Sequence, residues 1–506
     1  MTEALPTPAP TGRVAPSDAF VEVDTAVGRV RGAWRPTVGS DVRSAAFLGI
    51  PFAQPPVGEL RFAAPVPVES WEGVRDALEF GATAQRGDPG VTLIPEPSVP
   101  GDATLNVNVF TPVPGQADAA LPVLVWIHGG GYFAGSPASP WYDGRNFNRD
   151  GVVTVSISYR LGFIGFGHVD GAPDNRGVRD WIAALEWVQE NIRAFGGDPR
   201  RVTIAGQSAG GGAVLTLLGI EKAQHLFHGV WSLSPALADV APERARTLTA
   251  KVANHLGVEP TRAALEAVDE DRLIEAQKAA TDAGRDVAAL LDGGLGLGPS
   301  IDGDLIVRPT SDSLRAGVGA DKPLVLGATD DEFAMALAGQ EKKLRWIPLS
   351  LLLGRMGLTA PARRAYLAAN KDVVAKGHAA VLGRYVSDKV FKMGVVRAAD
   401  ARGDAPTWVY RYSYAGSPFG SAVHCIDVPF WFDCLDSSVG IPALAGEHPP
   451  QALADATHGA AVVLIREGRA EWPAWSDDAG VTRVFGGPAS RSDVQRDGYA
   501  GVRPLL

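Results

Sequence analysis

Between Arg201 and Leu218 the chain reads RVTIAGQSAGGGAVLTLL: a β-branched run, a serine between glycines, and a run rich in alanine and leucine. The first run suits a buried strand and the last suits a helix. Gly206 and Gly210 flank Ser208 as G-x-S-x-G, and so sharp a turn leaves no room for Cβ atoms beside its apex. The segment predicts a strand, a turn and a helix, with the Ser208 hydroxyl pointing into a cleft. The N-terminus of the helix, which is the positive end of its dipole, is directed at this hydroxyl. An ordinary glycine turn is the alternative interpretation.

Apolar strands alternate with helical patterns around this unit. The predicted strands lie at 121–127, 152–159, 201–205, 323–327 and 407–414. Residues 178–195 follow helical spacing, and short β-rich runs between 21 and 52 predict an antiparallel N-terminal meander. This order indicates an α/β fold with a large, mostly parallel central sheet and helices on both faces.

The 506 residues contain no linker rich in proline, glycine or charge that would divide them. We therefore expect one domain over 21–506, with helical insertions, including amphipathic helices in 345–382, that roof the active site. Residues 1–20 hold four prolines and no apolar run, which predicts a flexible N-terminal arm.

Composition excludes several classes of partner. The net charge is −10, and nucleic-acid binders concentrate Lys and Arg instead, so no nucleic-acid partner is expected. The chain has no run of about 18 apolar residues, so no membrane partner is expected either. The two cysteines, Cys425 and Cys434, fit a reducing compartment and hence a cytoplasmic location, although a single disulfide between them stays open.

A serine hydroxyl needs a base and an orienting acid to act as a nucleophile at neutral pH. In sheets of this type the acid and then the histidine follow the serine along the chain, each on a loop after a later strand. Ser208, an acid within Asp330-Asp331-Glu332, and His424 occur in that order. Glu332 is the favoured acid and Asp331 the alternative, because a single sequence does not fix which carboxylate turns inward.

His424 is chosen from nine histidines because it lies in a loop after a predicted strand. Three others precede every acid candidate within helical segments, and one sits in a plain helical pattern; they are His225, His228, His255 and His458. A hydrogen-bonded core or surface histidine is the alternative interpretation of His424.

A triple glycine, Gly129-Gly130-Gly131, follows the predicted strand at 121–127. Such a loop offers backbone N–H groups to a developing oxyanion, and the N–H of Ala209 is their natural partner. A structural turn is the alternative. The chain contains no H-E-x-x-H and no paired C-x-x-C, so neither a metal nor another cofactor is expected.

With these motifs the sequence resembles the type-B carboxylesterase family, which includes bacterial p-nitrobenzyl esterases, carbamate hydrolases and, in animals, the cholinesterases. The resemblance rests on ordered motifs at 47–56, 125–131, 175–177, 195–199, 206–211, 299–303, 331–332 and 424–430. It implies an α/β-hydrolase fold and a small-molecule ester as substrate. By the family pattern, the nucleophile is Ser208, the acid Glu332, the base His424, and the oxyanion donors Gly130, Gly131 and Ala209. Ser234 resembles a residue that supports the acid.

Two departures from the family pattern bear on these expectations. Gln207 stands where the family usually has glutamate, which removes a buried charge near the nucleophile. Thr83 and Thr104 stand where secreted members have a disulfide pair, which favours a cytoplasmic enzyme of the bacterial type.

Together these features predict a serine esterase that cleaves carboxylic esters through an acyl-enzyme, with an apparent pKa of roughly 6 to 7 for the His424 base. No cluster of Lys or Arg lies near the triad motifs, so small neutral esters are expected. The candidate pocket residues are Phe133, Phe333, Trp431 and Phe432, with core packing as the alternative for the aromatic pair after His424. Carbamate or amide hydrolysis, or a non-catalytic binding role, are the rival functions, and the oligomeric state stays open.

Overall fold

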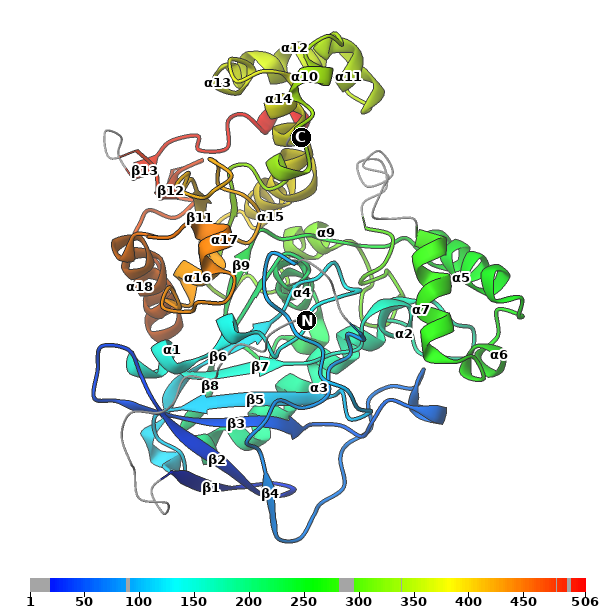
Figure 1. The fold of residues 1–506 in the computed structure, drawn as a ribbon, viewed down its shortest axis with the longest axis vertical. Coiled ribbons are helices and arrows are strands. Elements are labelled where there is room, and N and C mark those ends of the chain that lie inside the picture. Colours follow the sequence, from blue (N-terminus) through cyan, green and yellow to red (C-terminus); the bar gives the residue numbers. More distant parts are fainter. Residues whose placement is uncertain (1–18, 88–91, 282–294, 338, 479, 489–492) are drawn as a thin grey trace, which may run out of the picture.

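The fold is organised around one mixed β-sheet (Figure 1). The computed structural model describes residues 19–87, 92–281, 295–337, 339–478, 480–488 and 493–506. Within them the sheet has 13 strands in the order β1-β2-β3-β5-β7-β6-β8-β9-β10-β11-β12-β13, with β4 paired to β2. The strands are β1 (Phe20–Thr25), β2 (Gly28–Pro36), β3 (Arg43–Pro51), β4 (Val74–Asp76), β5 (Asn106–Thr111), β6 (Leu121–Ile127), β7 (Val153–Ile157), β8 (Gly197–Gln207), β9 (Gly229–Leu233), β10 (Leu324–Thr329), β11 (Thr407–Tyr412), β12 (Thr482–Phe485) and β13 (Val494–Gln495).

The central strands from β7 to β12 pair in parallel, and the pairs from β1 to β7 and β12 to β13 are antiparallel. The α/β class, the mostly parallel centre and the antiparallel N-terminal meander are therefore confirmed. The predicted arm at 1–20 lies outside the described residues except for its last two, and Phe20 already belongs to β1.

Helices cover both faces of the sheet (Figure 1). They are α1 (Arg145–Arg149), α2 (Gly162–Phe166), α3 (Arg176–Asn191), α4 (Ala209–Leu218), α5 (Pro242–Leu256), α6 (Arg262–Glu266), α7 (Glu270–Thr281), α9 (Thr310–Arg315), α10 (Glu341–Leu344), α11 (Leu349–Arg355), α12 (Ala360–Ala369), α13 (Lys371–Val374), α14 (His378–Ser387), α15 (Met393–Ala401), α16 (Val428–Trp431), α17 (Ile441–Ala445) and α18 (Gln451–Glu467). The helix predicted at 178–195 ends at Asn191 and continues as a 3₁₀ turn to Phe195.

The alternation of side chains along β6 shows why the sheet is covered twice. Val123, Val125 and Ile127 point into one hydrophobic core, which includes α3 and α4. Leu124 and Trp126 point into a second core, which includes α16 and α18. Both sets are buried, as expected for a continuous apolar strand between two layers of helices.

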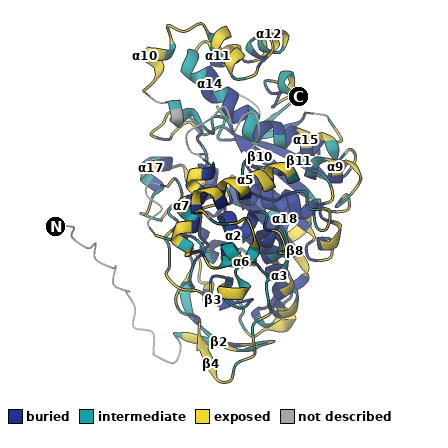
Figure 2. Cartoon of the chain, turned by 90° about the vertical axis from the view of Figure 1, so that its right-hand side faces the viewer, coloured by how far each residue is buried: buried dark blue, intermediate teal, exposed yellow. Residues whose placement is uncertain are grey.

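The site lies at the carboxyl ends of the central parallel strands. β8 runs directly into α4 at Ser208, β10 is followed by 330–332, and β11 by the loop that holds His424. The short helices α10 to α13 project from the far end of the molecule, where many of their residues are exposed (Figure 2). Among the described helices, none combines the length and the apolar character needed to cross a bilayer.

Candidate active site

Ser208 occupies the turn between β8 and α4 in a conformation that L-residues rarely adopt, with φ 60° and ψ −120°. Its glycine neighbours are required by contact. A Cβ on Gly206 would lie 2.4 Å from the carbonyl oxygen of Gly210, and a Cβ on Gly210 would lie 2.0 Å from that of Ile127. Packing against the first turn of α4 and against β6 therefore requires glycine at both positions and holds the serine at the apex.

The structure brings His424 and Glu332 to this serine. Nε2 of His424 lies 3.0 Å from Oγ of Ser208, and Nδ1 lies 2.5 Å from Oε2 of Glu332. The other carboxylate oxygen, Oε1, accepts a 2.8 Å hydrogen bond from the Thr329 N–H at the end of β10. Glu332 is buried and Ser208 half-buried, so the three side chains form a continuous chain from the interior to the cleft.

The adjacent acids turn elsewhere. Asp331 forms an ion pair with Arg384 at 2.8 Å, and Asp330 forms one with Arg411 at 2.8 Å. Ser234 was expected to support the acid, but its buried hydroxyl has no hydrogen-bond partner within the described residues. That expectation is corrected: the strand-end N–H of Thr329 holds Glu332 instead.

The glycine loop after β6 presents free donors. Gly130 and Gly131 have φ of 96° and 62°, and a Cβ on Gly130 would lie 2.1 Å from the Ala134 carbonyl oxygen. Within the described chain, the N–H groups of Gly130, Gly131 and Ala209 donate to no other group. These groups are thus available to an external oxygen.

Gln85 supports this loop, and sequence reasoning missed it. Its Oε1 accepts a 2.7 Å hydrogen bond from the Gly135 N–H, while its Nε2 donates to the Glu96 carbonyl at 2.7 Å. The side chain thereby fixes the far end of the glycine loop to the segment before β5. No local pattern around Gln85 signals this long-range contact.

His424 sits between charged and aromatic neighbours. Burial alone lowers the pKa of its imidazole, but contact with the Cys425 sulfur and the Glu332 carboxylate raises it, and the net pKa lies well above the ordinary 6.5. The Phe391 ring packs against the imidazole with centroids 4.7 Å apart, and Phe333 stacks at 6.2 Å. These rings keep His424 in a partly apolar environment.

We expect kcat/KM for a neutral ester to rise with pH with an apparent midpoint above 6.5, because a general base must be unprotonated and the pKa of His424 is raised. This moves the midpoint upward from the roughly 6 to 7 expected for an ordinary imidazole. Initial rates at substrate concentrations far below KM, measured across the acid limb, give the value. A midpoint clearly below 6.5 would contradict the raised pKa.

Gln207 lies against the same imidazole, with its Nε2 3.2 Å from Nε2 of His424. We expect Gln207→Glu to move the acid limb upward by about one pH unit, because a carboxylate at this distance stabilises the imidazolium. The shift is measured by comparing kcat/KM–pH profiles, with Gln207→Met as the uncharged control that should not raise the limb. An unchanged limb in Gln207→Glu would show that the 207 side chain does not act on His424.

A second buried carboxyl, that of Asp427, lies three residues after His424 and was not predicted. The Tyr410 hydroxyl donates to its Oδ2 at 3.2 Å, and Oδ1 has no partner within the described residues. Burial, followed by repulsion from Glu332, raises the pKa of Asp427 to about 7. Near neutral pH this carboxyl is therefore partly protonated, which limits the negative charge beside Glu332.

Two of the four predicted pocket residues are in the core. Trp431 and Phe432 are fully buried, and their rings pack on Trp126 with centroids 5.2 and 4.8 Å apart. The prediction that they line the cleft is therefore wrong, and the core alternative holds. Phe133 is 56% exposed, and Phe333 faces His424.

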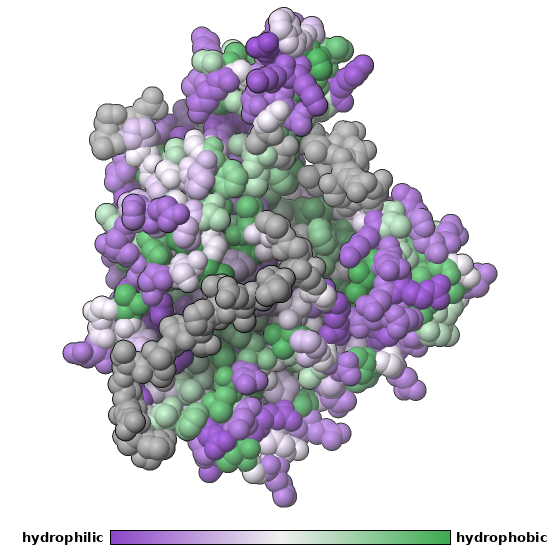
Figure 3. Space-filling view, viewed as in Figure 1, coloured by the Kyte–Doolittle hydropathy of each residue, from purple (hydrophilic) through white to green (hydrophobic). Residues whose placement is uncertain are grey.

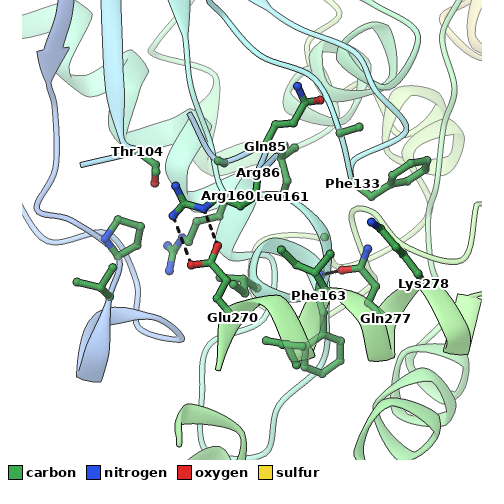
Figure 4. Close-up of a pocket in the computed structure, with 18 of the residues that line it drawn as sticks. Gln85, Arg86, Thr104, Phe133, Arg160, Leu161, Phe163, Glu270, Gln277 and Lys278 are labelled. Carbon is green, nitrogen blue, oxygen red and sulfur yellow. Dashed lines mark hydrogen bonds and ion pairs between the residues drawn. The ribbon is translucent and has the colours of Figure 1, made fainter. Parts of the chain in front are cut away.

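A cavity of about 680 Å³ adjoins the glycine loop (Figure 4). Phe133 and Ala134, which follow the triple glycine, form part of its wall, and α7 forms another part. Its lining mixes apolar and charged side chains: Arg86 pairs with Glu270 at 2.9 Å, and Lys278 also faces the space. The motifs around the triad predicted a site without clustered Lys or Arg, whereas the lining of this cavity does contain such side chains.

Within the described residues, no group of three or more His, Cys, Asp or Glu side chains is arranged to hold a metal ion. The two cysteines are free and buried. A metal-free, cofactor-free reaction stays a prediction.

Known proteins share both sequence and fold with this chain. The model of the carboxylesterase family matches residues 19–438. The para-nitrobenzyl esterase of Bacillus subtilis is 30% identical over 92% of this chain and 94% of its own length. The phenmedipham hydrolase of Pseudarthrobacter oxydans is 32% identical over 91% of this chain and 95% of its own. Among solved structures, a PNB esterase superposes with a TM-score of 0.79 at 28% identity, covering 96% of this chain and 99% of that one.

Proposed function

Because the chain belongs to the carboxylesterase family and is a carboxylic ester hydrolase of the α/β-hydrolase fold, we propose that Ser208, His424 and Glu332 are its catalytic triad. The observation that carries this proposal is the pair of contacts of His424, 3.0 Å to the Ser208 hydroxyl and 2.5 Å to the Glu332 carboxylate. The Thr329 N–H fixes the carboxylate, and the carboxylate fixes the imidazole tautomer that can accept the serine proton.

In the proposed reaction, Oγ of Ser208 attacks the ester carbonyl while Nε2 of His424 takes its proton. The negative carbonyl oxygen is held by the N–H groups of Gly130, Gly131 and Ala209, which have no other acceptor in the described chain. Collapse of this intermediate expels the alcohol, which receives the proton from His424. Water, deprotonated by His424, then attacks the acyl-enzyme and releases the acid.

The 680 Å³ cavity beside the glycine loop is the proposed site for one part of the substrate. Its size is that of a small-molecule pocket. Arg86 is paired with Glu270 and Arg160 with Asp180. Lys278 shares the lining with Asp102, so cations and carboxylates occur together. This balance supports neutral rather than strongly anionic esters.

We expect kcat/KM to be highest for short neutral esters such as p-nitrophenyl acetate or butyrate and to fall toward palmitate. Each further methylene contributes only about 0.8 kcal/mol, and only where a pocket buries it. Matched anilides should be slower, since an amine leaving group needs fuller protonation by His424. The acyl series from acetate to palmitate measures this: a maximum at palmitate, or anilides as fast as esters, would overturn the substrate assignment.

Carbamate hydrolysis is the second candidate function. A carbamate presents the same carbonyl to the same three side chains, and the phenmedipham hydrolase relative, which covers 91% of this chain, favours testing it. A carbamate series measured beside the esters decides which substrate class has the higher kcat/KM. A non-catalytic role is disfavoured by the complete set of Ser208, Glu332 and His424.

We also propose a cytoplasmic, bacterial-type enzyme. The free, buried thiols of Cys425 and Cys434 support a reducing compartment. Thr83 occupies its position with a hydroxyl that accepts the Val99 N–H at 2.9 Å, so this segment is held without a disulfide. Cell fractionation followed by activity measurement tests the location.

A further inference from the structure

Residues 341–376, here named the basic cap, form the projecting helices α10 to α13 (Figures 1 and 2). The basic cap contains eight Lys and Arg against two acids, a net charge of +6, in a chain whose total is −10. The cations are Lys342, Lys343, Arg345, Arg355, Arg363, Arg364, Lys371 and Lys376. Positive charge is therefore concentrated at one end of an acidic protein.

These cations are not neutralised by neighbours. No ion pair involves any of the eight within the described residues, whereas Arg384, in the following helix, pairs with Asp331 at 2.8 Å. All are exposed except Arg363, which is half-exposed. The cap therefore presents its charge to solvent.

Large apolar side chains are exposed among the same cations. Trp346 is 76% exposed, Ile347 37% and Leu351 48%. The Arg345 guanidinium lies over the Trp346 ring at 4.7 Å, so cation and aromatic ring form one unit. Purple hydrophilic and green hydrophobic side chains alternate on this end of the molecule (Figure 3).

The exposed trio is not needed to close the core of the cap. That core is a separate cluster in which Leu353, Tyr366, Val373 and Tyr385 are buried. The Tyr366 hydroxyl donates to Asp388 at 2.8 Å, which ties the cluster to the body of the protein. The folded cap thus keeps three large apolar side chains exposed among its cations.

We propose that the basic cap docks on the surface of an anionic lipid bilayer. Trp346, Ile347 and Leu351 would enter the headgroup region, and the surrounding Lys and Arg would face lipid phosphates. An interfacial tryptophan beside a polybasic segment is the combination that such surfaces bind. A nucleic acid could contact the cations and stack a base on Trp346, but it would leave Ile347 and Leu351 without an apolar partner, so the bilayer fits all of these side chains.

The basic cap is connected to the reaction site through one helix. Helix α14 follows the cap, and its Ser387 hydroxyl accepts the Phe333 N–H at 3.1 Å, next to Glu332. This proposal departs from the expectation of no membrane partner, which rested on the absence of a spanning segment. Binding at the surface needs no such segment and is independent of the proposed esterase activity.

The experiment is co-sedimentation of the full chain with vesicles of phosphatidylcholine alone or in an equal mixture with phosphatidylglycerol. We expect binding to the anionic vesicles, at least about 100-fold weaker binding to the neutral ones, and release by high salt. Lys342→Gln, Lys343→Gln and Arg345→Gln combined should weaken the partition coefficient by about 100-fold, at about fivefold per charge. Trp346→Ser should weaken it as well.

The matched control replaces three exposed cations of α5, Arg244, Arg246 and Lys251, by Gln. This triple variant has the same net charge as the cap variant and should bind nearly as the parent does. Turnover of a soluble ester and the melting temperature, unchanged in all variants, show that they are folded. The proposal is overturned by no binding to anionic vesicles, by equal loss in the α5 variant, or by unchanged binding in Trp346→Ser. Cap-dependent self-association without vesicle binding would assign the surface to a second copy instead.

Discussion

Replacement of Ser208 by alanine is expected to lower kcat by about 10⁴-fold or more, while a fluorophosphonate probe labels the parent once per chain and the variant not at all. The Ser208 Oγ is a hydroxyl oxygen with a nucleophilic lone pair, and it lies 3.0 Å from Nε2 of His424, the base that would take its proton. Alanine keeps the backbone of the turn and removes only the hydroxyl. The large loss should therefore appear in turnover and not in folding.

Intact-mass measurement after labelling, with peptide mapping, locates the modified residue. Circular dichroism and thermal melting of the variant provide the folding control. Residual turnover above the water rate is expected, because the N–H groups of Gly130, Gly131 and Ala209 still surround the carbonyl oxygen. Labelling of a different serine in Ser208→Ala would falsify the assignment of the nucleophile.

The turn around Ser208 could be predicted from sequence because its requirement is local and steric. A Cβ added to Gly206 or to Gly210 would come within 2.4 Å of a carbonyl oxygen, so only glycine fits at either position. The same holds for the loop at Gly130. Alternating strands and helices have long periodic patterns, so the sheet could also be predicted.

The orientation of the side chains in the loops could not be predicted, since it depends on partners that are distant in the sequence. Asp331 and Glu332 are adjacent in the sequence, but different partners orient their carboxylates. Asp331 pairs with Arg384 on α14, whereas Glu332 accepts a hydrogen bond from the Thr329 N–H on β10. Trp431 and Phe432 follow the His424 loop in sequence, yet a short helix carries them into the aromatic core around Trp126.

The exposed surface of the basic cap could not be predicted from the sequence for a related reason. The sequence at 345–382 has an amphipathic pattern, which predicts helices with one buried face. The pattern does not tell which apolar residues remain outside once a small separate core, around Leu353 and Tyr366, is filled. Exposure of Trp346 at 76% is a result of that tertiary packing.

Replacement of Glu332 by glutamine is expected to lower kcat by about 10⁴-fold with the fold retained. The two oxygens of Glu332 accept hydrogen bonds from opposite sides, from the Thr329 N–H at 2.8 Å and from Nδ1 of His424 at 2.5 Å. An amide has only one acceptor oxygen. If that oxygen keeps the Thr329 bond, the amide NH₂ faces Nδ1 and stabilises the tautomer with the proton on Nε2, which is unable to take the Ser208 proton.

If the amide turns the other way, its NH₂ opposes the Thr329 N–H in a buried position, which costs about 1–3 kcal/mol and loosens the imidazole. Either arrangement therefore lowers kcat. Asp331→Asn is the matched control, since it makes the same chemical change one residue earlier but breaks the ion pair with Arg384 at 2.8 Å. It should reduce the melting temperature more than Glu332→Gln, because the Asp331–Arg384 pair is largely buried. It should change kcat by less than about tenfold, because Asp331 does not contact His424. Steady-state kinetics and thermal melting of both variants decide the matter: if Asp331→Asn is the variant that loses kcat, the orienting acid is Asp331, one residue before the position proposed.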